Sequence, residues 1–335
     1  MSEKIKLVSY GVRAVEEAIF HNSNTFNYEL VLVKELLTDD NVHLCEGANG
    51  VILRGNCKAH RANLEKMKNM GLKYVLTRTV GFDHIDLNAV KDLGFELCAR
   101  VPSYSPNAIS ELAVSMALGL YRKTFKMFSN SSKHNFMASD DLFAKEIRLS
   151  TVGVIGAGRI GMESIKSFFG LGAKVLAFEP YPSDVLKNFA TIVDLDTLAK
   201  ESDIIVLHAP YIKDSNHHMI NKDFISKMKD NSIIVNMARG ELIDTSALID
   251  GLESGKIDSC ALDVVEGETS VFFKNFEGKN IEDKNIEKLL SFFPRVILTP
   301  HLGSFTDEAV RNMVEISYSN LDEYLKTGKC KNTII

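Results

Sequence analysis

Three polar segments of this sequence carry residue types that move protons and bind anions. Arg239 lies in NMARG, Glu268 ends the acidic run DVVEGE, and His301 lies in TPHLG. Each segment follows an apolar stretch typical of a buried strand, and ligands of parallel α/β sheets bind beyond the carboxyl ends of the strands. An imidazole can give and take a proton near neutral pH, a carboxylate stabilises the imidazolium, and a guanidinium binds a carboxylate. Together they predict one cleft.

Each of these residues also has a simpler explanation when it is taken alone. His301 could cap the helix predicted over Thr306–Leu325, and Arg239 could form a surface ion pair. The three segments together favour a reactive site.

A glycine-rich segment, GAGRIG, starts at Gly156 and matches G-x-G-x-x-G. It follows an apolar strand predicted over Thr151–Ile155 and opens a helix predicted over Met162–Phe169. In such a βαβ unit Gly156 makes the tight turn, Gly158 lets the backbone approach a pyrophosphate, and Gly161 lets the helix pack on the strand. The helix N-terminus attracts phosphate groups. The segment therefore predicts a dinucleotide site.

Glu179 supports this interpretation, since it ends a second apolar strand predicted over Lys174–Phe178. It lies 18 positions after Gly161 (179 − 161), close to the roughly 20 typical of the acid that binds the adenosine ribose. A carboxylate there would repel a 2′-phosphate, so we expect NAD rather than NADP.

The composition is that of an ordinary globular protein. The 335 residues are 25% charged and 45% hydrophobic, with a net charge of −5, so neither nucleic acid nor an anionic membrane is expected as a partner. The N-terminus, MSEKIKLVSYG, lacks the apolar core of a signal peptide, and we expect a cytoplasmic protein.

The cysteines indicate neither a disulfide framework nor a zinc site. There are five of them, scattered and without a C-x-x-C pair. We expect reduced thiols, with Cys98 and Cys260 in the core.

Alternating strands and helices predict two α/β units with parallel sheets. The first unit precedes the glycine motif, with strands predicted over Lys4–Tyr10, Tyr28–Val33, Gly50–Leu53, Tyr74–Arg78 and Phe95–Ala99. The segment VPSYSP then marks a stiff crossover. The helix predicted over Ala108–Tyr121 is apolar enough to be either deeply buried or in contact with another subunit.

At this point the chain resembles the D-isomer-specific 2-hydroxyacid dehydrogenases over essentially its whole length. The resemblance rests on GAGRIG, NMARG, DVVEGE, TPHLG and VPSYSPNAI. It implies a Rossmann NAD-binding domain (102–299) inserted into a flavodoxin-like substrate domain (1–101 plus 300–335), and a homodimer. It also implies hydride transfer between NADH and a 2-oxo acid.

The resemblance assigns roles to individual residues. His301 would be the acid/base, Glu268 rather than Glu266 would orient it, and Arg239 would bind and polarise the substrate. The backbone of Val80 and Gly81 would hold the substrate carboxylate. The residues implied to contact NAD are Gly156, Gly158, Arg159, Ile160, Gly161, Glu179, Pro210, Ala238 and Asp263. None of this chemistry needs a metal.

Arg54, in VILRGNC, bears on the choice of substrate. It follows a predicted strand in the region that supplies the family's side-chain pocket, and an arginine there would bind a second carboxylate. YGVRAVE, VILRGNC, LTRTVGFDHID and HLGSFTDEAVRNMVE resemble (R)-2-hydroxyglutarate dehydrogenases. We therefore favour 2-oxoglutarate, with Tyr104 also facing the substrate. If Arg54 is structural, a D-lactate or D-2-hydroxyisocaproate dehydrogenase is the alternative.

A non-enzymatic NAD-sensing protein related to transcriptional corepressors is an alternative of another class, because fold does not fix function. A methyltransferase would not explain the motifs of Arg239 and His301. Among the other histidines, we expect His84 and His208 to be structural or to support the site, and His217 and His218 to be solvated.

Overall fold

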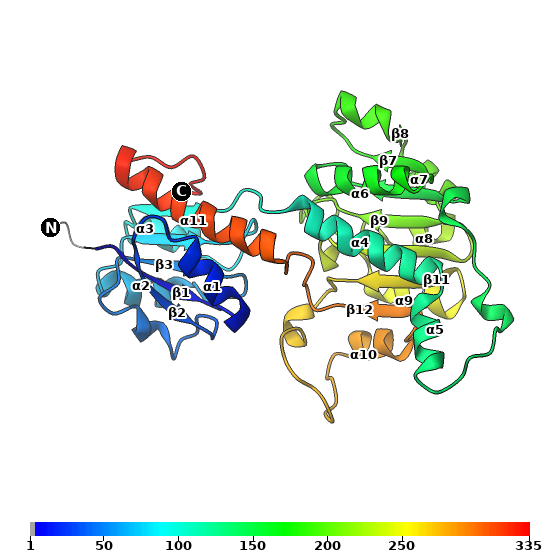
Figure 1. Cartoon of the computed structure of the whole chain (residues 1–335), viewed down its shortest axis with the longest axis horizontal. Coiled ribbons are helices and arrows are strands. Elements are labelled where there is room, and N and C mark those ends of the chain that lie inside the picture. The colour runs from blue at the N-terminus through cyan, green and yellow to red at the C-terminus, as the bar shows by residue number, and fades with distance from the viewer. Residues whose placement is uncertain (1–3) are drawn as a thin grey trace. The chain divides into compact units, whose positions relative to one another are not determined.

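The computed structural model describes residues 4–335 and divides into two compact units (Figure 1). One unit holds the chain up to Ser105 together with Phe305–Ile335, and the other is Pro106–Ser304. The chain thus leaves the first unit and returns to it. Both boundaries fall a few residues later than the sequence indicated, and residues 1–3 of the expected substrate domain lie outside the described part.

The first unit is built on a five-stranded parallel sheet with the strand order β2-β1-β3-β4-β5. This order is that of flavodoxin-like folds. The strands are β1 (Lys6–Tyr10), β2 (Glu29–Val33), β3 (Gly50–Leu53), β4 (Tyr74–Thr77) and β5 (Leu97–Arg100).

Helices cover both faces of this sheet, because successive strand residues point to opposite faces and both sets are apolar. Leu7 and Ile52 pack with α1 and α11, whereas Val8 and Val51 pack with α2 and α3. The helices are α1 (Ala14–Asn22), α2 (Arg61–Asn69), α3 (Leu87–Asp92) and the C-terminal α11 (Asp307–Thr327), which lies on the unit formed by the N-terminal strands (Figure 1).

The second unit contains a seven-stranded parallel sheet with the order β12-β11-β10-β9-β6-β7-β8. If β6 is taken as the first strand, this is the strand order of a doubly wound dinucleotide-binding fold, with β12 as one additional strand at the edge. The strands are β6 (Thr151–Ile155), β7 (Lys174–Phe178), β8 (Thr191–Ile192), β9 (Ile204–Leu207), β10 (Ser232–Asn236), β11 (Ile257–Leu262) and β12 (Val296–Leu298). The expected α/β class with two parallel sheets is confirmed.

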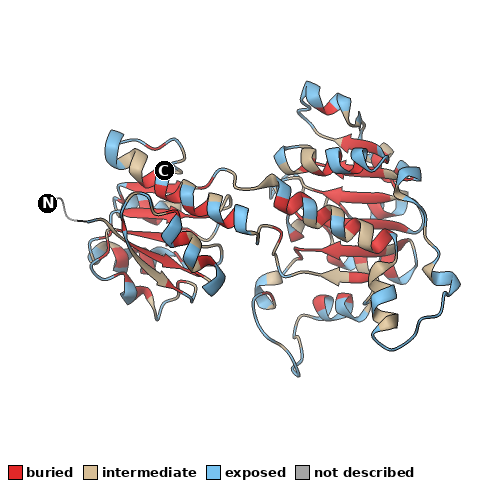
Figure 2. Cartoon of the chain, viewed as in Figure 1, coloured by how far each residue is buried: buried red, intermediate tan, exposed pale blue. Residues whose placement is uncertain are grey.

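In this unit α4 and α6 pack on one face of the sheet, and α7 to α10 bury the large apolar cluster of the other face. The helices are α4 (Pro106–Tyr121), α5 (Thr124–Ser131), α6 (Arg159–Gly170), α7 (Leu195–Glu201), α8 (Lys222–Lys227), α9 (Thr245–Glu253) and α10 (Lys284–Ser291). Figure 2 shows the sheet strands of both units largely buried.

The apolar character of α4 is explained within its own unit. Ala113, Ala117 and Leu120 are buried, and α4 packs on α6, β10 and β11. Asn107, Glu111 and Ser115 form its exposed side.

Some elements were not identified as such from the sequence. These are the 3₁₀ turn η1 (Val42–Cys45), helix α5 and strand β8. All five cysteines are buried, which confirms the expectation for Cys98 and Cys260 and extends it to Cys45, Cys57 and Cys330. Within residues 4–335, no helix has the length and apolarity needed to cross a bilayer.

Candidate active site

The glycine loop after β6 has the geometry that a dinucleotide requires. Gly156 has φ of +91°, and a Cβ there would lie 2.6 Å from the backbone nitrogen of Ala209. A Cβ on Gly161 would collide with the Gly156 carbonyl, whereas a Cβ on Gly158 would meet nothing within 4 Å. Helix α6 begins at the next residue, Arg159. Open space in front of a helix N-terminus fits a pyrophosphate.

Glu179 lies beside this loop. It directly follows β7, and its carboxylate accepts hydrogen bonds from the backbone N–H of Ala157, at 2.8 Å, and of Tyr181, at 3.1 Å. Ala157 stands between the first two glycines of the motif. The structure therefore holds a negative charge at the loop, as recognition of a ribose hydroxyl pair by an acid would require.

His301 and Glu268 form a close pair. The His301 Nδ1 atom lies 2.7 Å from Glu268 Oε1, and the second oxygen of Glu268 accepts a hydrogen bond from the Val265 N–H at 3.1 Å. With Nδ1 donating to the carboxylate, Nε2 is the ring nitrogen available to a substrate. The imidazole is 39% exposed, so this nitrogen can be reached.

Asp263 holds the loop that carries His301. Its carboxylate accepts hydrogen bonds from Thr299 Oγ1 (2.7 Å) and from the N–H groups of Leu302 and Gly303 (both 2.8 Å). Its carbonyl accepts from the His301 N–H at 2.9 Å. Burial raises the pKa of Asp263, and these hydrogen bonds oppose the rise.

This loop imposes an uncommon backbone on His301, whose φ is +53°. The left-handed conformation is uncommon for a residue other than glycine, so the surrounding hydrogen bonds must hold it. Asp263 thus acts as the anchor of the loop, a role that the sequence analysis missed. The sequence did contain a signal for this role. Asp263 is a polar residue at the end of a strand, and the next strand leads into the TPHLG loop.

Arg239 lies on the loop after β10. Asn236 shapes this loop by donating to the Arg239 carbonyl at 2.9 Å and accepting from the Ala238 N–H at 3.0 Å. Gly240 packs so closely on the backbone of Val265 that a Cβ would collide with it. The loops after β10 and β11 are therefore in contact. Arg239 itself is exposed.

The remaining residues expected to contact NAD follow strands of the same sheet. Pro210 comes after β9, and its carbonyl accepts a hydrogen bond from Asn216 Nδ2 at 2.7 Å. Ala238 is buried at the end of β10, and Arg159 and Ile160 open α6. These segments border the point where strand order reverses between β6 and β9, which is where nucleotides bind in such sheets.

The substrate residues expected in the first unit follow neighbouring strands. Arg54 comes after β3, and Val80 and Gly81 come after β4. The Val80 carbonyl accepts from Arg100 at 3.1 Å, and the Gly81 carbonyl accepts from Thr79 Oγ1 at 2.7 Å. In the described part of the chain, the N–H groups of Val80 and Gly81 donate no hydrogen bond.

Tyr104 precedes the unit boundary after Ser105, and its carbonyl accepts a hydrogen bond from Asn312 Nδ2 at 2.7 Å. The expectation that its ring faces the substrate stays a prediction.

The other histidines differ in their surroundings. Burial lowers the pKa of His84 and of His208 to about 4, and their Nε2 atoms lie 3.2 Å from Thr77 Oγ1 and 2.8 Å from Ser164 Oγ, respectively. His217 is exposed, as expected. The expectation of a solvated His218 was wrong, because its Nε2 atom lies 2.6 Å from Glu266 Oε1.

Comparisons with known proteins agree with this architecture. Residues 114–303 match the family model "D-isomer specific 2-hydroxyacid dehydrogenase, NAD binding domain". The chain is 44% identical over 330 residues to an aromatic 2-oxoacid reductase of Clostridium sporogenes, covering 98% of both chains.

Two solved structures are similar over nearly the whole chain. A D-lactate dehydrogenase of Treponema pallidum has a TM-score of 0.90 at 35% identity, over 99% of this chain and 100% of its own. A D-lactate dehydrogenase of Lactobacillus jensenii, solved with NAD⁺, has a TM-score of 0.84 at 35% identity, with the same coverage.

These relatives are reductases and dehydrogenases, which sets aside the interpretation as a non-enzymatic NAD sensor. The glycine loop fits the cofactor that the family model names. The chain belongs to the D-isomer-specific 2-hydroxyacid dehydrogenase family and is an NAD-dependent oxidoreductase acting on 2-hydroxy acids.

Proposed function

We propose that this enzyme interconverts 2-oxoglutarate and (R)-2-hydroxyglutarate. Of the acids that the family's chemistry allows, a dicarboxylic one is favoured by a single observation, the position of the Arg54 guanidinium near those of Arg13 and Arg78. The same residues and cofactor would serve any 2-oxo acid at the reacting carbon, so the choice of acid rests on the first unit.

At the reacting carbon, the chain supplies a proton and electrostatic stabilisation. NADH supplies the hydride when it is bound. His301 would donate the proton from Nε2 to the carbonyl oxygen, and Glu268 stabilises the imidazolium through Nδ1. Arg239 would stabilise the negative charge that develops on that oxygen. In the reverse direction, neutral His301 takes the proton back.

The N–H groups of Val80 and Gly81 are suited to hold the 1-carboxylate of the substrate. They are adjacent in sequence and make no hydrogen bond within the described residues, whereas the carbonyls of the same loop are bonded. Backbone donors of this kind bind an anion without the entropic cost of fixing a long side chain.

Arg54 lies near two other guanidiniums. Its pKa is lowered to about 10, first by burial and then by the nearby guanidiniums of Arg13 and Arg78, while Glu16 opposes the shift. Glu16 is fully buried and accepts hydrogen bonds from Arg13 (3.1 Å) and Arg78 (2.9 Å). Two guanidiniums thus bind Glu16, and the guanidinium of Arg54 lies near enough to both of them to feel their charge. A substrate carboxylate at Arg54 would reduce this repulsion between like charges.

This charge lies close to the loop proposed to hold the 1-carboxylate. Strands β3 and β4 are paired, with Leu53 opposite Thr77, so Arg54 and Thr79 follow adjacent strand ends. A Cβ on Gly55 would lie 3.7 Å from the Thr79 methyl group. A substrate with carboxylates at both ends could contact both places.

The relatives named above favour other acids. The similar proteins are an aromatic 2-oxoacid reductase and D-lactate dehydrogenases. The alternatives are therefore D-lactate or D-2-hydroxyisocaproate as substrate, with Arg54 in a structural role.

Steady-state oxidation of NADH separates these choices. We expect kcat/KM to be higher for 2-oxoglutarate than for pyruvate, 2-oxoisocaproate or phenylpyruvate. A preference for any of the last three would reject the dicarboxylate proposal, and no turnover with the whole panel would reject the proposed reaction.

We also propose a homodimer. The sequence pointed to Ala108–Tyr121, but the apolar side chains left exposed lie further along the chain. Between α4 and β6, the exposed large apolar residues are Met127, Phe128, Phe136, Met137, Phe143 and Leu149. Exposed apolar side chains gathered in one segment are typical of an interaction surface, and a second copy of the chain is the partner expected from the family resemblance.

A further inference from the structure

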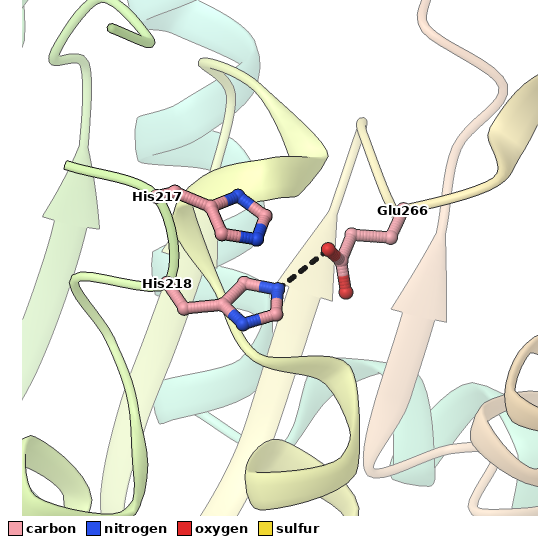
Figure 3. Close-up of side chains that lie close together, drawn as sticks. All are labelled: His217, His218 and Glu266. Atoms are coloured by element: carbon pink, nitrogen blue, oxygen red, sulfur yellow. Dashed lines mark hydrogen bonds and ion pairs between the residues drawn. The ribbon is translucent and has the colours of Figure 1, made fainter. Parts of the chain in front are cut away.

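Two adjacent histidines meet a carboxylate on the second unit (Figure 3). His217 and His218 lie between β9 and α8, and Glu266 follows β11. The two imidazole rings are stacked, with centroids 3.8 Å apart and planes inclined by 22°. The His218 Nε2 atom lies 2.6 Å from Glu266 Oε1. Figure 3 shows a nitrogen of His217 on the side of its ring that faces Glu266.

The backbone fixes this arrangement on the His218 side. His218 has φ of +52°, in the left-handed region, and its N–H donates to the Glu241 carbonyl at 2.9 Å. The next turn of chain is tied to the same segment, since Ile220 and Ile243 form an isolated parallel bridge. The His218 backbone is therefore held in place, while the exposed His217 side chain is positioned by the stacked His218 ring and by Tyr211.

The potential ligand atoms are close enough to share an ion. One ligand atom from each of the three residues lies within 4.8 Å of the others. Zinc bonds of 2.0–2.2 Å in a tetrahedral site place ligand atoms about 3.3 Å apart. The site would close through a small rotation of His217 and a lengthening of the His218–Glu266 contact.

In His217 and Glu266, the atoms that would not bind the ion already have partners. The Tyr211 hydroxyl lies 3.3 Å from His217 Nδ1, and Thr245 Oγ1 donates to Glu266 Oε2 at 3.0 Å. These contacts leave His217 Nε2 and Glu266 Oε1 for coordination. Metal-binding histidines and carboxylates usually have such outer hydrogen bonds, which fix the tautomer and the orientation of the ligand.

From this juxtaposition we propose that His217, His218 and Glu266 form a binding site for one divalent transition-metal ion, with Zn²⁺ as the reference ion. Two imidazoles and one carboxylate suit Zn²⁺, Co²⁺, Ni²⁺ or Cu²⁺, whereas Mg²⁺ prefers oxygen ligands. The fourth position is open to water. The site shares no residue with the proton-transferring pair, although Glu266 stands two residues before Glu268 in the chain.

Isothermal titration calorimetry of the untagged, full-length protein with Zn²⁺ and with Mg²⁺ tests this site. We expect one equivalent of Zn²⁺ to bind and Mg²⁺ to give no saturable heat. His217→Ala should weaken Zn²⁺ binding at least about tenfold, because losing even an outer partner of a ligand typically costs 10- to 100-fold. His217 is exposed, so this variant should fold, and retained NADH binding would verify that.

His60→Ala is the matched control. His60 is also exposed and pairs with a carboxylate, Asp39, at 2.7 Å, but it has no adjacent histidine. This variant should bind Zn²⁺ like the wild type. The proposal is rejected if the wild type does not bind Zn²⁺, if His217→Ala binds it equally well, or if both variants lose binding alike. Failure of 2-oxoglutarate turnover would leave these results unaffected.

Discussion

Asp263 holds the loop that carries His301, but the two side chains are not hydrogen-bonded to each other. Asp263 binds Thr299, Leu302 and Gly303 on either side of the histidine, and its carbonyl holds the His301 N–H at 2.9 Å. The side chain of His301 is thereby left for Glu268, at 2.7 Å. One acid fixes the backbone and the other fixes the ring.

This division of roles predicts the effect of removing the imidazole. We expect His301→Asn to fold, because asparagine tolerates the left-handed backbone of position 301. Turnover should fall about 10²- to 10⁴-fold, as is typical when a general acid is lost. NADH binding, measured by fluorescence, should persist. Turnover within a few-fold of the wild type in a folded variant would remove His301 from the mechanism, and His60→Asn is a control at an exposed histidine.

Cofactor choice is predicted to depend on the charge of Glu179. The wild type should use NADH far more efficiently than NADPH, because the carboxylate repels a 2′-phosphate. Glu179→Gln keeps one oxygen that can accept from the Ala157 N–H, so it removes the charge and, of the two backbone contacts, only the one with the exposed Tyr181. Its NADPH/NADH ratio of kcat/KM should rise. Comparable efficiency of both cofactors in the wild type would contradict this explanation.

Much of this molecule could be predicted from the sequence, because its strands and the loops after them are short and local. The strand predicted over Gly50–Leu53 has the observed bounds, and GAGRIG lies where the strand–helix pattern placed it. The choice of Glu268 rather than Glu266 as the partner of His301 came from the resemblance to the family. The sequence could not show what Glu266 does instead, since its partner His218 lies 48 positions away.

Side-chain environments were harder to predict than elements. Apolar composition made α4 a candidate subunit contact, yet composition does not say which side of a helix is covered by its own sheet. Likewise, Arg54 could be recognised as a cation, but its neighbours Arg13 and Arg78 come together only in the fold.

Two partly buried histidines, His84 and His208, should make the enzyme less stable in acid. Their pKa values are lowered by burial from 6.5 to about 4 in the folded state. Between those values the unfolded chain binds a proton at each imidazole and the folded chain does not. The free energy of unfolding therefore falls as the pH drops from about 6.5 toward 4. Above this window the two groups contribute no pH dependence.

Thermal unfolding at pH 7 and pH 5 checks this prediction. His208→Gln keeps a side chain that can bond the Ser164 hydroxyl but cannot titrate. The drop in Tm between the two pH values should be smaller in this variant than in the wild type. An equal drop would show that His208 is not the source of the acid sensitivity.

The proposed dimer predicts that the segment between α4 and β6 is covered in solution. Phe143 is 89% exposed in the single chain. Phe143→Asp would place a charge in an apolar interface, so light scattering at micromolar concentration should show a dimer for the wild type and a monomer for the variant. Val15→Asp, at a side chain 71% exposed on α1, should stay dimeric. A monomeric wild type would reject the proposal.

The substitution Arg54→Leu tests the central claim most directly, through the ratio of kcat/KM for 2-oxoglutarate to that for 2-oxoisocaproate. A desolvated charge pair is worth about 2–5 kcal/mol, so this ratio should fall by roughly 30- to 4,000-fold. Arg61→Leu, which removes an exposed guanidinium paired with Asp92, should leave the ratio unchanged. A wild-type preference for the aliphatic acid, or an equal effect of Arg54→Leu on both substrates, would contradict the account.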